Sequence, residues 1–420
     1  MVERIRFFLN RVRERLWIRP LAFCMLSIAG AFLAKMADHT KLGQIVPEIK
    51  PESIETLLSI IAASMLVIST FAVASMLSAY ATASSTATPR SFALVVSDDV
   101  SQYALSTFIA AFIFSIVALV ALQNGYYAKA GHFALFVLTL LVFALVILTF
   151  LRWVDRIARL GRLTSTIDKV EKATAAAMQR WRCAPTLGGA PVGLGQNAGQ
   201  AIYGGSIGYV QRIAVNTLQT YAEDTGIRIT VTALPGAFSA PGQALAYVIS
   251  DSVDLSDIDL SRITEAFHIG DDRTFDEDPR FGLIALSEIA SRALSPAIND
   301  PGTAITIIGR FVRLFALWTE PIEEGDKRTT EYDCVEVPEI SLWDMFDDAF
   351  SSIARDGAGT IEVAVRLQKA LESLASIGAT TLRDVAIHHA RLALARSENA
   401  LELPEDLEVL RKVGKFGNPA

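Results

Sequence analysis

Four long apolar stretches near the N-terminus constrain the fold of this chain more than any other feature. They cover residues 17–36, 54–80, 103–122 and 132–151. Each is long enough to supply the ~20 residues that a helix needs to cross ~30 Å of hydrocarbon. The last three carry no charged residue after Glu55, and in the first, Arg19 and Lys35 flank a shorter uncharged core and can snorkel to the interfaces. The sequence therefore predicts a four-helix transmembrane bundle over residues 1–151.

Basic residues flank this region on both sides. They are Arg4, Arg6, Arg11, Arg13, Arg15 and Arg19 before the first stretch, and Arg152, Arg156, Arg159 and Arg162 after the fourth. Because basic flanks stay on the cytoplasmic side, both termini are expected in the cytoplasm of a multi-pass inner (plasma) membrane protein. A cleaved signal peptide is the rival interpretation of the first stretch, but no small-residue cleavage site stands before Lys35.

The second stretch is rich in hydroxyl and small residues. At 100° per residue, Ser64, Ser75, Ser78 and Thr82 fall within one narrow stripe. Such a stripe either lets helices pack closely or lines a wet path through the membrane, and both interpretations stay open. No acidic or basic residue lies at mid-membrane depth, which disfavours a proton-coupled pump.

The segment between the second and third stretches, residues 80–102, is too polar at its ends to span a membrane. It is predicted either to lie along the inner interface or to fold against the bundle. Arg90 is expected to anchor at lipid phosphates, and Asp99 to cap the third span.

The rest of the chain divides by composition into a helical stalk (residues 152–184), a Pro/Gly-rich linker (185–199), a small β-containing module (200–250) and a helical domain (251–420). The predicted fold class is a mostly α membrane protein with a cytosolic α+β domain. Strands are expected at residues 206–213, 227–234 and 244–249, and helices at 215–221, 341–354, 360–377, 380–397 and 404–413.

The stalk is expected to continue the fourth span without a break. Apolar and small residues recur in it at alternating three- and four-residue steps: Leu160, Leu163, Ile167, Val170, Thr174, Ala177 and Trp181. This heptad-like seam indicates either a subunit contact, which we favour, or packing of the stalk on its own domain.

Residues 280–313 form two amphipathic helical patterns with a hinge at residues 295–301. Asn299 or Asp300 can cap the second helix, and Pro301 fits its first position. Polar side chains between two apolar helices suggest a binding site that includes Ser295, Asn299 and Asp300. A purely structural capping role is an equal alternative.

The segment 251–278 is acidic and ends near Arg273 and Asp278, which we include in the same hypothetical regulatory pocket. Its carboxylates do not follow the calcium-loop spacing, and no metal site is predicted. The three cysteines are far apart and indicate no disulfide framework, and the net charge of −7 argues against a nucleic-acid partner. His388 and His389 are adjacent, so on a helix they cannot form an i, i+4 metal pair. No hydrolase, protease or P-loop motif occurs, so the chain is expected not to be an enzyme, and the sequence indicates no cofactor.

Several short motifs resemble a bacterial family of predicted membrane proteins, domain of unknown function 2254. They are Thr88-Pro89-Arg90, residues 102–108, Gly208-Tyr-Val-Gln211, Pro235-Gly236 with Phe238, Gly270 with Arg273, Phe281-Gly-Leu, and residues 293–301 with Thr303-Ala304. The last is the most specific. Family members usually carry an aromatic residue or Gln before the Thr-Pro-Arg piece, where this chain has the Ala/Ser/Thr-rich residues 81–87. The resemblance implies a bacterial membrane location and this layout, and it transfers no catalytic residue.

Three functions are consistent with these features. The first is an oligomeric channel or transport protein in the lipid bilayer, with a cytosolic sensing domain that binds a small molecule. The second is a membrane-anchored scaffold or signalling adaptor that binds a protein partner at the hinge. The third is a metal-dependent hydrolase that uses Asp276, Glu277 and Asp278.

Overall fold

The computed structural model describes residues 18–40, 45–96, 99–157, 162–193, 199–250, 255, 258–322, 330–377 and 380–417. The chain divides into two compact units, Met1–Thr166 and Ile167–Ala420. Each unit has its own core, and each is described separately below.

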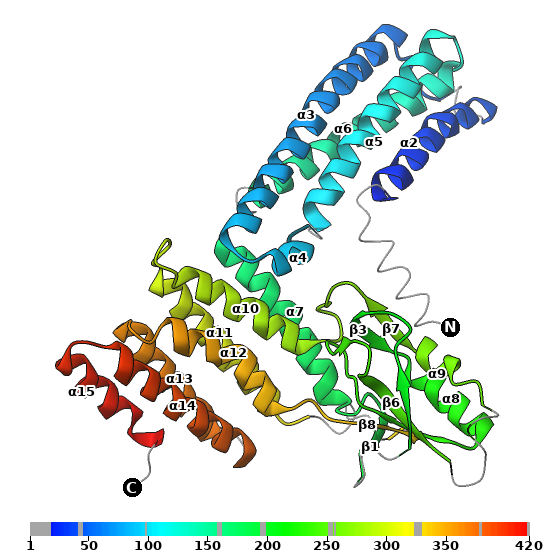
Figure 1. Ribbon diagram of the computed structural model, residues 1–420. Coiled ribbons are helices and arrows are strands. Elements are labelled where there is room, and N and C mark those ends of the chain that lie inside the picture. Colours follow the sequence, from blue (N-terminus) through cyan, green and yellow to red (C-terminus); the bar gives the residue numbers. More distant parts are fainter. Residues whose placement is uncertain are drawn as a thin grey trace. The chain divides into compact units, whose positions relative to one another are not determined.

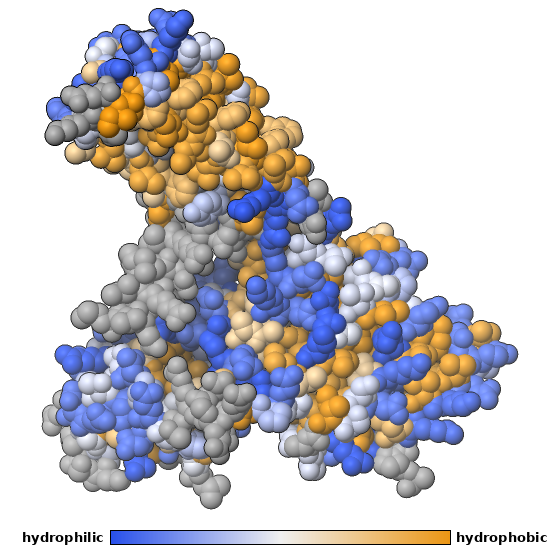
Figure 2. Space-filling view, turned by 180° about the vertical axis from the view of Figure 1, so that it is seen from behind, coloured by the Kyte–Doolittle hydropathy of each residue, from blue (hydrophilic) through white to orange (hydrophobic). Residues whose placement is uncertain are grey.

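The first unit is a bundle of four long helices (Figure 1): α2 (Ile18–Met36), α3 (Pro51–Thr86), α5 (Asp99–Gln123) and α6 (Lys129–Ile157). The helix α5 packs against the other three. Leu58 and Phe114 are among the residues buried between them. Figure 2 shows hydrophobic residues covering the side of the bundle, with hydrophilic residues gathered at one end, as expected of a surface that faces lipid.

A polar network closes one end of the bundle. The carboxylate of Asp38 accepts hydrogen bonds from the backbone N–H groups of Ala128 (2.9 Å) and Gly131 (2.6 Å), at the start of α6. The hydroxyl of Tyr127 donates to the backbone carbonyl of Ala31 on α2 (2.8 Å). The two bonds to Asp38 satisfy backbone donors at the beginning of α6 that have no partner within the helix.

Five described helices, rather than four, are long and apolar enough to cross a membrane. The fifth is α11 (Pro301–Thr319), which belongs to the second unit. Its apolar face is buried there: the Phe311 and Phe315 rings lie 5.3 and 5.7 Å from that of Phe350. The expected count of four membrane spans is therefore not confirmed and remains a prediction.

The expected unbroken helix from the fourth span into the stalk is wrong. The helix α6 ends at Ile157, Arg162 is not helical, and α7 (Leu163–Cys183) begins after it. Five residues of the predicted heptad seam are buried, namely Ile167, Val170, Thr174, Ala177 and Trp181. Leu160 lies outside the described residues. These residues are buried within the chain itself, as the alternative interpretation, packing of the stalk on its own domain, predicts.

The second unit contains more β-structure than the sequence predicts. Its five-stranded sheet has the order β1-β8-β4-β6-β2, and a three-stranded sheet has the order β5-β3-β7. The strands are β1 (Gly189–Pro191), β2 (Gln200–Tyr203), β3 (Gly208–Ile213), β4 (Arg228–Val231), β5 (Phe238–Ser239), β6 (Ala244–Ile249), β7 (Phe267–Gly270) and β8 (Tyr332–Val337). The β3, β4 and β6 strands were expected, whereas β1, β7 and β8 lie outside the predicted module.

Two short helices, α8 (Val215–Thr225) and α9 (Ser261–Glu265), accompany the sheets. The helix α8 extends four residues beyond the expected 215–221 and ends at Thr225, where Gly226 adopts a left-handed conformation (φ 70°) that favours glycine. Ile229, Val248 and Val335 come from three neighbouring strands and are fully buried in one apolar core. The parallel pairing of β8 with β1 and β4 ties residues far apart in the chain into this module.

Six helices complete the unit: α10 (Pro279–Ala293), α11, α12 (Leu342–Asp356), α13 (Ile361–Ile377), α14 (Thr380–Ala400) and α15 (Pro404–Val413). They agree with the sequence periodicity to within a few residues. Phe315, Phe346 and Phe350 stack between α11 and α12 and form the centre of this helical core.

His389 on α14 is buried, with an exposed fraction of 4%. Its Nε2 lies 3.6 Å from Asp347 and has no hydrogen bond within the described residues. Its ring packs against Phe346, whereas the neighbouring His388 is exposed and contacts Trp343. Burial lowers the pKa of His389 from 6.5 to about 4.

We expect this histidine to make the second unit acid-sensitive. Its folded pKa is depressed, so only the unfolded chain takes up the proton as the pH falls through about 6.5, and stability is lost until the pH reaches about 4. The loss should reach about 2 kcal/mol by pH 5. Urea titrations of the solubilised chain at pH 7.5 and 5 measure this difference in the free energy of unfolding. His389→Phe should remove most of this difference, and an unchanged difference would contradict the assignment.

Candidate functional site

The hinge between α10 and α11 is a capping turn. Asp300 Oδ1 accepts a hydrogen bond from the Thr303 backbone N–H (3.1 Å), and its Oδ2 accepts one from the Thr303 hydroxyl (2.6 Å). Asn299 takes a left-handed conformation (φ 50°), and its N–H donates to the carbonyl of Ser295 (2.8 Å). The Ser295 hydroxyl donates to the carbonyl of Arg292 (2.7 Å). Ser295 and Asp300 thus have local capping roles, as the structural alternative predicts, while the Asn299 side chain is exposed.

Arg273 and Asp278 form a bidentate ion pair. The Arg273 Nε and Nη2 atoms lie 2.7 and 3.0 Å from the two carboxylate oxygens of Asp278, whose exposed fraction is 2%. Asp278 also accepts a hydrogen bond from the Phe281 backbone N–H (3.1 Å), so it caps α10. The Arg273 guanidinium lies 5.5 Å from the Phe281 ring centroid, in cation–π contact. One carboxylate therefore neutralises a partly buried charge and begins a helix.

Gly236 packs its backbone against this ion pair. It has a φ of 94°, and a Cβ atom there would lie 2.3 Å from Asp278 Oδ2 and 2.8 Å from Arg273 Nη2. The Gly236 N–H donates to the carbonyl of Val210 on β3 (2.8 Å). Gly236 thus joins the three-stranded sheet to the start of α10 through a close approach that only glycine permits.

Other motif residues converge on the same sheet. Gln211 on β3 donates a hydrogen bond from its side chain to the carbonyl of Asp272 (2.7 Å), directly over Gly270. The Tyr209 and Phe238 rings pack 5.1 Å apart across β3 and β5. The motifs that are scattered over residues 208–281 in the sequence thus meet around one ion pair.

The structure does not unite the two halves of the hypothetical regulatory pocket. Arg273 and Asp278 lie at the start of α10, and Ser295, Asn299 and Asp300 lie beyond its end. The helix has 15 residues, which corresponds to about 22 Å. A single small-molecule pocket containing all five residues is therefore not formed.

Two of the three carboxylates proposed for a metal-dependent hydrolase, Glu277 and Asp278, face arginine side chains. Glu277 lies 3.3 Å from Arg212, and its backbone carbonyl accepts a hydrogen bond from the Trp181 indole (2.8 Å). Asp278 is held by Arg273, and Asp276 is exposed. Within the described ranges, no three His, Cys, Asp or Glu side chains are grouped so as to hold a metal ion. This geometry gives the hydrolase hypothesis no support.

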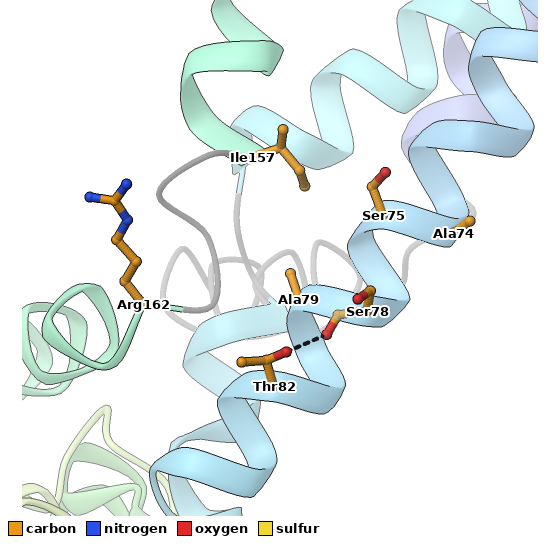
Figure 3. Close-up of a pocket in the computed structure, with 7 residues that line it drawn as sticks. All are labelled: Ala74, Ser75, Ser78, Ala79, Thr82, Ile157 and Arg162. Atoms are coloured by element: carbon orange, nitrogen blue, oxygen red, sulfur yellow. Dashed lines mark hydrogen bonds between the residues drawn. The ribbon is translucent and has the colours of Figure 1, made fainter.

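The hydroxyl stripe lies on the outer surface of α3. Ser64, Ser78 and Thr82 are exposed and Ser75 is half-buried, whereas α3 faces the bundle with residues such as Leu58 and Met65. Figure 3 shows Ser75, Ser78 and Thr82 on successive turns of α3, where they line an open pocket of about 500 Å³. The remaining lining residues are Ala74, Ala79, Ile157 and Arg162. Ser64 lies farther along α3, outside this pocket.

The pocket combines hydroxyl groups with one positive charge. The Thr82 hydroxyl donates to the carbonyl of Ser78 (3.0 Å). Arg162 is exposed and contributes the guanidinium group (Figure 3). Thr82 is 28 residues beyond the buried Ile54, or about 42 Å along the helix, which exceeds the ~30 Å hydrocarbon layer. The pocket therefore belongs to the interfacial end of α3.

The segment after α3 folds as two short helices, η3 (Pro89–Ser91) and α4 (Phe92–Val96). Thr88 caps η3, since its hydroxyl accepts a hydrogen bond from the Arg90 N–H (3.4 Å). Arg90 is exposed, as a lipid-phosphate anchor requires. Asp99 is the first residue of α5, at the capping end that the sequence indicates, and its side chain lies outside the described residues.

Two contacts of α7 were not predicted. A Cβ atom at Gly282 of α10 would lie 1.9 Å from Thr174 Oγ1, so the two helices cross in van der Waals contact at this point. Arg310 of α11 pairs with Asp168 (2.6 Å) and with Glu171 of α7. Thr174 and Ala177, which are smaller than the other residues of the heptad pattern, could have indicated this helix crossing, because close crossings need small side chains.

A bundle of long helices with an apolar surface, followed in the chain by a second unit that is largely polar outside, is typical of a helical membrane protein. A family model described as a predicted membrane protein, domain of unknown function 2254, matches residues 13–373. The chain belongs to this family, as the sequence motifs predicted.

Curated relatives cover only part of the chain. Uncharacterized proteins of Mycobacterium tuberculosis and Mycobacterium bovis are 33% identical over 105 residues, which is 24% of this chain and 20% of each relative. The chain thus matches about a fifth of the length of these relatives. No solved structure matches it.

Proposed function

We propose that the protein is an oligomeric channel or transport protein of the bacterial inner membrane, with both termini and the second unit in the cytoplasm. The observation that carries the proposal is the position of the hydroxyl stripe on the outer face of α3. Side chains that face lipid are expected to be apolar, so exposed hydroxyl groups on a membrane helix favour contact with another helix or with water.

Because the inward side of α3 is closely packed within one bundle, we place the permeation path at the contact between copies. The residues of α3 that point inward, such as Leu58 and Met65, are buried against neighbouring helices, and Phe114 fills the centre. Ser64, Ser75, Ser78 and Thr82 point away from this core. When copies associate through α3, these hydroxyl groups line the shared surface.

The charge at the end of the stripe favours anions. Arg162 lines the same pocket as Ser75, Ser78 and Thr82, and within the described residues that pocket contains no acidic side chain. A guanidinium group at the mouth of a path raises the local concentration of anions. Chloride is therefore the first solute to test.

Flux measurements on the purified chain in liposomes test this function. We expect chloride flux above that of protein-free liposomes, and Ser78→Leu should reduce it at least about tenfold, because an apolar constriction dewets a narrow path. Leu141→Phe is the matched control, since Leu141 is an exposed apolar residue of α6, and it should leave the flux unchanged. Absence of flux for chloride and for other small ions and solutes would contradict the proposal.

A scaffold or adaptor is the second candidate, supported by one feature of the hinge. Ile298, next to Asn299, is an apolar residue with an exposed fraction of 46%. An exposed apolar side chain beside an exposed amide is suited to a protein contact. A partner captured by the intact chain but lost with Ile298→Asp and Asn299→Ala would favour this candidate, and equal capture would count against it.

A further inference from the structure

The surface of α11 opposite its buried aromatic face carries a second pocket, in the second unit. It has a volume of about 600 Å³ and is lined by Ile305, Thr306, Gly309, Arg310, Arg313 and Arg366. Three guanidinium groups from two helices, α11 and α13, thus surround one hollow. Its size is that of a small-molecule site rather than of a macromolecular interface.

Only part of this positive charge is used by the fold. Arg310 is held by Asp168 and Glu171 of α7. Arg313 shares Glu171 through both its Nε (2.9 Å) and its Nη2 (2.8 Å) atoms. Arg313 nevertheless has an exposed fraction of 59% on its side chain. Arg366 is exposed and has no ion pair or hydrogen bond within the part of the chain that is described. Two carboxylates therefore face three guanidinium groups, and the pocket keeps a positive charge.

Gly309 lines the pocket, and neither its backbone conformation nor its packing requires glycine. Its φ is not positive, and a Cβ atom there would have no neighbour within 4 Å. Glycine inside a helix costs about 1 kcal/mol relative to alanine. A position that tolerates a side chain and yet lacks one leaves space for a group that approaches the helix backbone.

We propose that this pocket binds a phosphoryl group, carried either by a soluble phosphate ester or by a lipid headgroup. The guanidinium fork matches phosphate oxygens with two parallel hydrogen bonds. Arg366 supplies such a fork, which no carboxylate of the described residues holds, and the exposed Arg313 adds its remaining Nη1 donors to the same pocket. Arg310 is positioned by α7 and contributes fixed positive charge. This inference does not depend on the protein being a channel, since binding is measured without flux.

Calorimetric titration of the full chain in detergent tests the proposal with two probes, pyrophosphate and the short-chain lipid dihexanoyl phosphatidic acid. Saturable binding of pyrophosphate indicates a soluble phosphate ester, and binding of the lipid alone indicates a headgroup. Either result supports the site when Arg366→Gln weakens binding at least about tenfold. Binding of neither probe overturns the proposal.

Two further variants separate a built site from nonspecific charge. Gly309→Leu fills the hollow without removing a charge, and we expect it to abolish binding while the melting temperature stays equal or rises. Arg383→Gln removes an exposed arginine of α14 that lies outside the pocket and should change affinity less than about twofold. Wild-type affinity in Gly309→Leu, or equal losses in Arg366→Gln and Arg383→Gln, would overturn the assignment.

Discussion

Replacing Asp278 with alanine is expected to destabilise the second unit by about 4 kcal/mol. The change leaves the Arg273 guanidinium, 17% exposed on its side chain, without its partner, and it removes the acceptor that caps α10. Breaking a buried ion pair by removing one partner costs about 3–5 kcal/mol, and a lost cap about 1. Urea unfolding of the solubilised chain, followed by tryptophan fluorescence, measures the loss.

Three matched variants separate the contribution of the ion pair from that of the helix cap at Asp278. Asp278→Asn keeps an acceptor for the Phe281 N–H but removes the charge, so it should recover only the cap. Adding Arg273→Met to Asp278→Ala should recover part of the loss, because no unpaired charge remains. Asp276→Ala changes an exposed carboxylate two residues away and should alter stability by less than about 0.5 kcal/mol. A loss below about 1 kcal/mol for Asp278→Ala would show that the pair is not formed.

The second large effect is expected at the crossing of α7 and α10. Gly282→Leu should cost about 3 kcal/mol, because even its Cβ atom would overlap Thr174, with contacts of 1.9 Å to Oγ1 and 2.8 Å to Cβ. Thermal unfolding of the solubilised chain measures the loss. Thr174→Gly removes the overlapping atoms, so it should offset part of the cost in the double variant.

Gly309→Leu is the control for this substitution, since it places the same side chain on the neighbouring helix α11 where a Cβ atom meets nothing within 4 Å. Its stability should equal or exceed that of the wild type. Similar losses for Gly282→Leu and Gly309→Leu would contradict the helix crossing.

The helices were predictable from the sequence where a strong apolar period coincides with capping residues. Residues 360–377 and 404–413 were expected helices, and α13 and α15 match them to within one residue. The capping geometry of Asp300 followed from an Asp-Pro pair that precedes an apolar period. Local rules suffice in these places because the interactions that fix the structure lie within one helical turn.

The strands added by the structure depend on distant partners. The strand β1 has three residues and pairs with β8, whose residues lie more than 140 positions away, so neither strand shows its role locally. The strand β7 lies in the acidic segment 251–278, where the sequence analysis expects no strand. Short strands such as these form only when the rest of the sheet is already present.

The candidate sites show the same difference between features fixed by local sequence and features that depend on distant segments. The stripe on α3 followed from helical spacing alone, but spacing does not tell whether it faces the core or the exterior, and burial decides that. The ion pair of Arg273 with Asp278 and the close approach of Gly236 need three segments to meet. Sequence motifs marked these residues, whereas only the fold shows that they form one cluster.

Cysteine cross-linking in native membranes tests the central claim that α3 of one copy faces another copy. In a chain with Cys24, Cys183 and Cys334 replaced by alanine, Ser64→Cys and Ser78→Cys should each give cross-linked dimers with a short bifunctional maleimide. Leu141→Cys on the exposed face of α6 should stay monomeric. Dimers at Leu141 but not at Ser64 and Ser78, or none at all, would place α3 against lipid and contradict an oligomeric path along its hydroxyl face.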